Sequence, residues 1–168
     1  MISVKVGIIG NMNNNHFSLM RYLRDLGVDA YLILYSDDGR GSLSHFTPEN
    51  DTWDIEKWSK YIIQSEFPNG KKGALKYIFK RNRIKKFFDQ FDILLGNGFA
   101  PAYMAMIGRS LDVFLPYAIR GEFLHYMRSS NPVNNLSRAL QSKLQIEGLR
   151  RTKFICGVFD KMGYKFVE

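Results

Sequence analysis

A cluster of amide side chains follows the first hydrophobic run of the chain. The run from Val4 to Ile9 ends at Gly10, and the polar stretch Asn11-Met12-Asn13-Asn14-Asn15 leads into an amphipathic segment. Amide groups hydrogen-bond to hydroxyl and phosphate oxygens, and the free N–H groups at a helix start favour anions. The loop lacks the second and third glycines of the dinucleotide-binding motif G-x-G-x-x-G. The loop from Gly10 to Asn15 is therefore a candidate binding site.

His16 stands where this loop passes into the predicted helix. An imidazole there could polarise a phosphate or the hydroxyl group of an acceptor, which makes His16 a candidate catalytic residue. The alternative is a surface or capping histidine. The other two histidines, His45 and His125, show no metal-ligand spacing and are interpreted as surface residues. We therefore predict no metal site.

The positive charge of the chain is concentrated in one segment. The net charge is +8, and the stretch from Lys71 to Lys86 contains eight basic residues and no acidic one. Apolar residues at helical spacing between Leu75 and Phe91, Phe79 among them, predict a basic amphipathic helix or pair of helices. Such a helix can lie on an anionic membrane, hold phosphates, or present a solvated face above a packed core. The candidate anion-binding residues are Lys76, Lys80, Arg81, Arg83, Lys85 and Lys86.

Apolar strands alternate with helices along the chain. Strands are predicted at residues 4–9, 31–35, 91–95, 113–117 and 153–158, and helices at 16–26, 55–64, 75–88, 101–107 and 134–150. This alternation predicts an α/β fold with a Rossmann-like, doubly wound parallel sheet. Ligands of such sheets bind beyond the carboxyl ends of the strands, where the loop from Gly10 to Asn15 would lie.

Length and composition fit a single domain over residues 1–168. Of the 168 residues, 45% are hydrophobic and 24% are charged. The single cysteine, Cys156, excludes an internal disulfide and a zinc site made of cysteines, and its apolar neighbours predict a buried thiol. We find no signal peptide and no apolar run near the ~18 residues that span a bilayer. These features predict a cytoplasmic protein.

Four segments of the chain follow one another in an order that is known from one enzyme family. They are Val4 to Asn15, the helix end Leu26 to Ala30, Phe91 to Gly98, and Leu115 to Glu122. This order resembles the N-terminal domain of GT-B glycosyltransferases, in particular the family 4 type. The resemblance covers nearly the whole chain and implies a Rossmann-like domain that binds mainly the sugar acceptor. As substrate-binding residues, it places Gly10, Asn11, Asn14 and Asn15 in the first-strand loop that faces the donor phosphates and the acceptor, and Asn97 and Gly98 at the cleft after the third predicted strand.

The resemblance also implies an activity. The chain would be the acceptor-binding half of a nucleotide-sugar-dependent glycosyltransferase of the hexosyltransferase type, for glycan or polysaccharide synthesis. Arg120 and Glu122 would be catalytic and Gly121 substrate-binding, although relatives often have His-Gly or Gly-Ser-Asp in this loop. From the residues alone, Arg120 could clamp a phosphate, and a local Arg120–Glu122 ion pair is the alternative.

The resemblance further implies partners. The nucleotide-diphosphate sugar would be a co-substrate, and no cofactor is expected. The other partners would be a sugar or lipid-linked acceptor and a separately encoded donor domain, since residues 1–168 contain no counterpart of the family's donor-binding C-terminal domain. We therefore expect the chain alone to be inactive.

A non-catalytic binding module is the alternative function. In that case, the segment from Lys71 to Lys86 would recruit the chain to anionic lipid at the inner face of the membrane. Nucleic acid is a weaker form of this hypothesis, because the segment has no zinc-finger, homeodomain or RNA-recognition signature.

Overall fold

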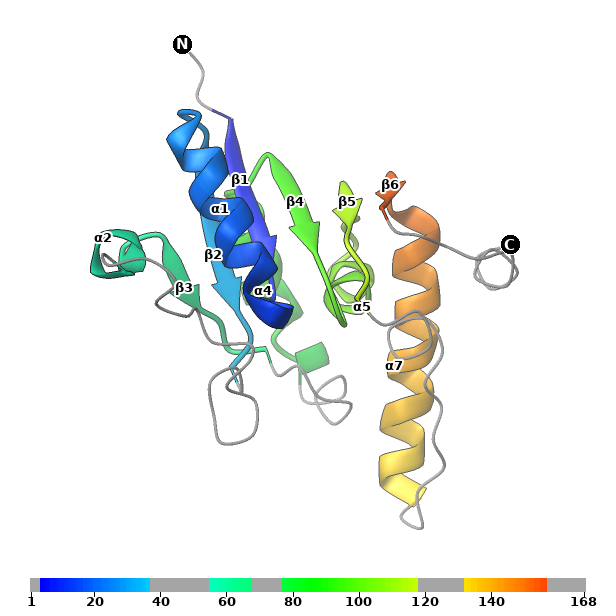
Figure 1. Ribbon diagram of the computed structural model, residues 1–168. Helices are drawn as coiled ribbons and strands as arrows, with labels where there is room; N and C mark the ends of the chain where they lie inside the picture. Colours follow the sequence, from blue (N-terminus) through cyan, green and yellow to red (C-terminus); the bar gives the residue numbers. More distant parts are fainter. Residues whose placement is uncertain (1–3, 37–54, 68–76, 118–131, 157–168) are drawn as a thin grey trace.

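A single parallel sheet forms the centre of the fold. The computed structural model describes residues 4–36, 55–67, 77–117 and 132–156. Within these residues, six strands pair in the order β3-β2-β1-β4-β5-β6, and every pairing is parallel (Figure 1). The strands are β1 (Lys5–Ile9), β2 (Asp29–Leu34), β3 (Ile62–Gln64), β4 (Ile93–Gly96), β5 (Val113–Phe114) and β6 (Phe154–Ile155).

Helices cover both faces of this sheet. The helices within the described residues are α1 (Asn15–Asp25), α2 (Ile55–Ser59), α4 (Arg81–Phe88), α5 (Ala100–Met106) and α7 (Pro132–Arg151), and a 3-10 turn (Met12–Asn14) precedes α1. A parallel sheet that carries helices on both faces is the Rossmann-like, doubly wound α/β fold. The structure thus confirms the predicted fold class.

The direction of winding changes between β1 and β4. From β1 the chain moves outward through β2 to β3, returns to place β4 on the other side of β1, and continues outward to β6. Val6 of β1 is aligned with Ala30 of β2 on one side and with Ile93 of β4 on the other. In open parallel sheets, the loops that follow the two strands at such a point diverge and leave a crevice for ligands. The loops after β1 and β4 therefore frame the candidate site.

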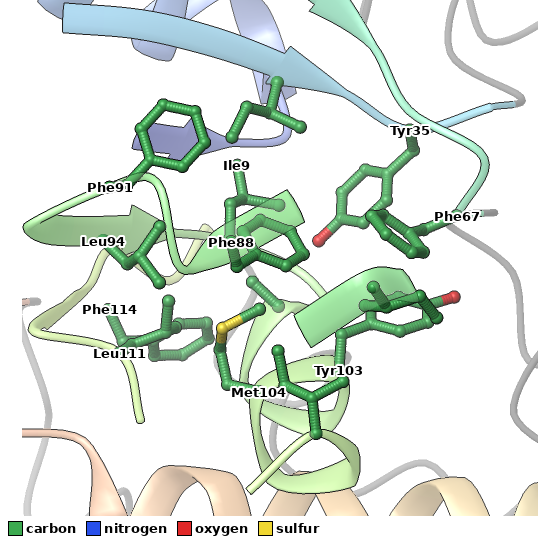
Figure 2. Packing of buried hydrophobic residues seen from close by; sticks show 14 of the residues in the cluster. Ile9, Tyr35, Phe67, Phe88, Phe91, Leu94, Tyr103, Met104, Leu111 and Phe114 are labelled. Atoms are coloured by element: carbon green, nitrogen blue, oxygen red, sulfur yellow. The ribbon is translucent and has the colours of Figure 1, made fainter. Parts of the chain in front are cut away.

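Each face of the sheet has its own hydrophobic core. Successive side chains of a strand point to opposite faces, and a strand covered on both sides is therefore apolar along its whole length. The core beneath α1 and α2 contains Val6, Ile8, Phe17, Met20, Ala30, Leu32, Leu34 and Trp58. The core beneath α4 and α5 includes Ile9, Tyr35, Phe67, Phe88, Phe91, Leu94, Tyr103, Met104, Leu111 and Phe114 (Figure 2).

Helix α7 packs against α5 and extends beyond the carboxyl ends of the strands (Figure 1). Gly148 makes the close packing possible, because a Cβ at this position would collide with the carbonyl group of Pro101 on α5. The end of α7 lies at the opposite edge of the sheet, where Lys153 donates its backbone N–H to the carbonyl of Leu111 at 3.2 Å. The first half of α7 is consequently held beside the carboxyl edge of the sheet, where the loops after β1 and β4 lie.

One strand of the structure is missed by the sequence prediction. A helix is predicted over residues 55–64, but α2 ends at Ser59 and β3 begins at Ile62. Ile62 and Ile63 are β-branched residues, which fit a pleated sheet better than a helix. They pair in register with Leu32 and Ile33 of β2.

The prediction of a buried thiol at Cys156 is wrong. Cys156 directly follows β6 and is exposed, although its backbone N–H still donates to the carbonyl of Phe114 at 2.9 Å. An edge strand has a neighbour on one side only, so apolar sequence neighbours do not ensure burial there.

Candidate functional site

The loop after β1 turns sharply at Gly10. Gly10 has φ +80°, and its backbone N–H donates to the carbonyl of Ile33 at 2.8 Å. A Cβ at this position would collide with Oδ1 of Asn97 and lie 2.7 Å from Cε2 of Tyr35. Only glycine combines this backbone conformation with the absence of a side chain. Gly10 therefore allows the loop after β1 to contact the loop after β4.

Asn11 holds the same loop against the start of α1. The side chain is fully buried, and its Oδ1 accepts the backbone N–H of Phe17 at 2.8 Å. Its Nδ2 donates to Oδ1 of Asn14 at 3.3 Å. Asn13 and Asn14 adopt the left-handed conformation, with φ of 51° and 63°, which asparagine tolerates better than most residues. Asn11 thus occupies part of the helix start that an anion would otherwise bind.

His16 is buried in the first turn of α1, with 1% of its surface exposed. Its Nδ1 lies 2.8 Å from the carbonyl oxygen of Gly10. Because a carbonyl oxygen can only accept a hydrogen bond, Nδ1 must carry the proton, and Nε2 of the neutral ring then has a free lone pair. Burial lowers the pKa of His16 to about 4, although the carbonyls of Gly10 and Ile9 raise it in part. The imidazole is therefore neutral at pH 7.

The lone pair of His16 Nε2 is buried, and no described residue donates a hydrogen bond to it. The ring of Tyr117, which follows β5, contacts the imidazole edge-on at a centroid distance of 6.0 Å. The amide nitrogen of Asn97 lies 3.3 Å from Nδ1. Because Nδ1 already donates its proton to the carbonyl of Gly10, this contact positions the ring but is not a second hydrogen bond. A buried acceptor that lacks a donor costs roughly 1–3 kcal/mol. A ligand that supplied a donor would remove this cost.

The loop after β4 packs against the loop after β1. Asn97 is 2% exposed, and its backbone N–H donates to the carbonyl of Ile9 at 3.1 Å. Its own carbonyl accepts the hydroxyl of Tyr35 at 2.9 Å and the N–H of Ala100 at 3.1 Å. Gly98 follows with φ +56°. Ile9 of β1, Tyr35 directly after β2 and Ala100 of α5 thus fix Asn97 beside His16.

Gln145 of α7 holds this loop from the opposite side. Its Nε2 donates to the carbonyl of Gly98 at 2.9 Å, and its Oε1 accepts the N–H of Ala102 in the first turn of α5 at 3.1 Å. Gln141 lies one turn earlier on the same helix face and is 3% exposed. Its Oε1 is buried, and the described residues provide no hydrogen-bond partner for it.

Neither glutamine could be recognised from the sequence as part of a site. Helix α7 lacks a clear apolar stripe, so its sequence does not show which polar residues face inward. Glutamines spaced by four residues are also common on solvated helix faces. Only the contact between Gly148 and Pro101 reveals the buried face.

The buried polar side chains of the described residues all lie in this region or on α7, and none is charged at neutral pH. They are Asn11, His16, Asn97, Ser137, Gln141 and Gln145. Hydrogen bonds from neutral amides and an imidazole suit the hydroxyl groups of a ligand. Neutral side chains do not offset the charge of a buried phosphate. Phosphates are usually bound by cationic side chains.

The structure brings together part of the predicted site. Gly10, His16 and Asn97 contact one another where the loops after β1 and β4 meet, Asn11 follows Gly10 and binds the start of α1, and Gly98 is bound by Gln145. Asn14 is half-buried and contacts Asn11, whereas Asn15 is exposed. The predicted residues Arg120, Gly121 and Glu122 lie outside the described residues, as do His45 and His125.

The basic segment is described from Tyr77 onward, and its cations are exposed. Glu66 pairs with Lys80 at 3.3 Å and with Arg83 at 2.7 Å, and Lys85 pairs with Asp89 at 2.7 Å. Acidic residues outside the segment therefore offset part of its charge. The remaining described cations, Arg81 and Lys86, form no ion pair with a described residue, and Lys76 lies outside the described ranges.

The assignment of Phe79 to the apolar face is wrong, because its side chain is 93% exposed. The chain turns at Phe79 and Lys80 before α4 begins at Arg81. Because the turn interrupts the helix, the residues after it do not continue the helical spacing of the residues before it. Ile84 and Phe88 therefore reach the core, whereas Phe79 does not.

Two further features are absent from the described part of the chain. No group of His, Cys, Asp and Glu side chains in these ranges is arranged to hold a metal ion. No helix in the same ranges is long and apolar enough to cross a membrane.

Comparisons with known proteins provide little beyond the fold. No family model matches the sequence, and no curated protein matches it. Among solved structures, the chain is similar to a wide-type short-chain dehydrogenase/reductase from Veillonella parvula DSM 2008 in complex with NADP. The two chains are 14% identical, the match covers 92% of this chain and 68% of the other, and the TM-score is 0.43. A likeness of this degree carries no argument about function.

Proposed function

We propose that the chain is the acceptor-binding half of a nucleotide-sugar-dependent glycosyltransferase of the GT-B type. The sugar acceptor would bind in the crevice between the loops after β1 and β4, and a second domain would present the nucleotide sugar. The main supporting observation is the group of buried, uncharged polar side chains at the point where the direction of winding changes. The lone pair of His16 Nε2 lies at the centre of this group. Sugar hydroxyls both donate and accept hydrogen bonds, so they match this set without burying a charge.

In this proposal, His16 orients the acceptor. A hydroxyl group donates to Nε2, while the bond from Nδ1 to the carbonyl of Gly10 fixes the ring. A pKa of about 4 suits a hydrogen-bond acceptor better than a base that must take up a full proton. Arg120 and Glu122 are the proposed catalytic residues, with Arg120 stabilising the departing diphosphate and Glu122 accepting a proton or a sugar hydroxyl.

The geometry of the loop after β1 favours a hydroxylated ligand over a dinucleotide. Dinucleotide sites use glycines to bring the pyrophosphate close to the backbone at a helix start. Here Asn11 accepts the N–H of Phe17 at that helix start, and asparagines occupy the next left-handed positions. A pyrophosphate would have to displace the Asn11 side chain.

A binding experiment tests this proposal. The isotope-labelled chain is titrated with a panel of neutral methyl glycosides, with UDP-glucose and with NADP, and the amide resonances of Asn11, His16 and Asn97 are followed. At least one glycoside is expected to shift these resonances, and NADP is expected to leave them unchanged. If NADP shifts them and no glycoside does, the proposal is wrong and the crevice is a dinucleotide site.

Exposed Phe79 supports the second candidate function, binding to an anionic membrane. An aromatic side chain that is 93% exposed beside the cations of α4 resembles the arrangement of interfacial helices, in which an aromatic residue inserts and cations contact lipid headgroups. This function is compatible with the first, because a lipid-linked acceptor would be found at such a surface.

A further inference from the structure

Helix α7 carries a row of buried polar side chains. Ser137, Gln141 and Gln145 are spaced by four residues, which places them along one side of the helix, and all three are buried. Gln145 fixes the direction of this row, because it binds Gly98 in the loop after β4 and Ala102 in α5. The row therefore begins at the crevice.

Gln141 continues the row away from the sheet. One helical turn separates it from Gln145, a rise of about 6 Å. The first half of α7 runs past the carboxyl ends of the strands (Figure 1), and ligands of such sheets bind on that side of the sheet. The Oε1 of Gln141 is buried and finds no donor among the described residues. Buried polar atoms of native proteins nearly always have a partner, so a missing partner requires an explanation.

Gln141 and His16 carry the same kind of unsatisfied group. Oε1 of Gln141 and Nε2 of His16 are both buried acceptors without a donor among the described residues. One short loop connects them, since Asn97 contacts His16 and Gly98 contacts Gln145. A ligand that satisfies both acceptors needs two donor groups.

We propose that α7 forms a wall of the acceptor site and that Oε1 of Gln141 accepts a hydrogen bond from a second hydroxyl of the acceptor. This inference rests on the proposed function. It adds a specificity-determining residue, because Gln141 selects for a ligand that carries a hydroxyl at one position in addition to the hydroxyl bound by His16.

The test compares the same substitution at two neighbouring glutamines. In the free chain, Gln141→Leu removes an unpaired buried oxygen and is expected to raise the melting temperature. Gln145→Leu removes the hydrogen bonds to the carbonyl of Gly98 and to the N–H of Ala102 and is expected to lower it. A decrease for Gln141→Leu as large as that for Gln145→Leu would show that Gln141 is structural and would overturn the inference without any ligand.

The second arm uses the methyl glycoside of the panel that binds the wild-type chain and its monodeoxy analogues. Gln141→Leu is expected to weaken binding of the parent glycoside about tenfold, the effect of one lost hydrogen bond to a buried group. One deoxy analogue is expected to bind the variant and the wild type equally, because both partners of that bond are then absent.

The two proposals fail in different ways. If the wild-type chain binds no glycoside, the proposed function fails and the inference fails with it. If the wild-type chain binds and Gln141→Leu binds the parent and every deoxy analogue as tightly, only the inference is overturned. If Gln141→Leu weakened the binding of all analogues equally, the inference would also be contradicted, because a general change in the crevice would explain that result.

Discussion

The side-chain oxygen of Asn11 accepts the backbone N–H of Phe17 at 2.8 Å, so the loop after β1 caps the helix that follows it. This bond stabilises α1 at the end where the candidate ligand lies. It also reduces the number of free N–H groups that the helix offers to an anion. The same interaction therefore contributes to stability and, in the proposed function, to the choice of ligand.

Asn11→Ala is expected to lower the free energy of unfolding by about 1–2 kcal/mol, because the N–H of Phe17 loses its acceptor. Urea denaturation measures this change. Asn15→Ala is the matched control, since Asn15 is exposed and its replacement should cost less than about 0.5 kcal/mol. Equal losses for the two variants would show that the bond from Phe17 to Asn11 contributes nothing.

Gly10→Ala is expected to destabilise the chain far more than Gly27→Ala. Both glycines have positive φ, +80° and +82°, so both substitutions cost about 1–2 kcal/mol of backbone strain. Only at Gly10 would the new Cβ collide with Asn97, whereas Gly27 has nothing within 4 Å. The collision should add about 1–3 kcal/mol, measured as the difference between the two urea midpoints. A difference near zero would contradict the packing of the two loops.

The buried His16 predicts a loss of stability in mild acid. Its pKa is lowered to about 4 in the folded chain, so between pH 6.5 and 4 the unfolded chain binds a proton that the folded chain does not. The stabilising contribution is complete above pH 6.5 and is lost as the pH falls. From pH 7.5 to pH 5 we expect a loss of about 2 kcal/mol in the free energy of unfolding.

His16→Gln isolates this effect, because glutamine does not titrate. The difference in unfolding free energy between wild type and variant, measured by urea denaturation at each pH, should shrink as the pH falls to 5. A pH-independent difference would show that His16 has an ordinary pKa and is not buried as described.

Vesicle binding tests the cationic surface of α4. Phe79→Ser combined with Arg81→Glu and Lys86→Glu is expected to abolish co-sedimentation with vesicles that contain phosphatidylserine, since each cation near such a surface contributes about 1 kcal/mol. Lys57→Glu with Lys60→Glu is the control, because these exposed lysines lie at α2 and give the same change in charge. If the triple variant binds the vesicles as well as the wild type does, the cations of α4 contact only water and do not bind lipid.

The fold could be predicted from the sequence because its strands are buried and its helices amphipathic. Residues 4–9 and 31–35 are apolar on both faces, and such a pattern is typical of a parallel sheet. β3 could not be predicted, because a three-residue edge strand directly after a helix carries little periodicity of its own.

The sequence allowed a prediction of those parts of the candidate site that depend on neighbouring residues in the chain. Gly10 and Asn11 follow a recognisable strand, so their position at the carboxyl edge could be inferred. The burial of His16 and the contacts of Gln145 depend on segments that are distant in sequence, above all Asn97 and Gly148. Without the packing of α7 against α5, sequence reasoning cannot assign Gln141 to this site.

The nitrogen resonances of the His16 ring test the central proposal most directly. Long-range nitrogen–proton correlation spectra distinguish a protonated Nδ1 from a deprotonated Nε2. The account predicts a neutral ring with Nε2 deprotonated at pH 7, and a shift of Nε2 toward hydrogen-bonded values when a methyl glycoside saturates the chain, while Nδ1 remains bonded to Gly10. An Nε2 resonance that stays fixed while the amides of Asn11 and Asn97 respond to the glycoside would contradict it.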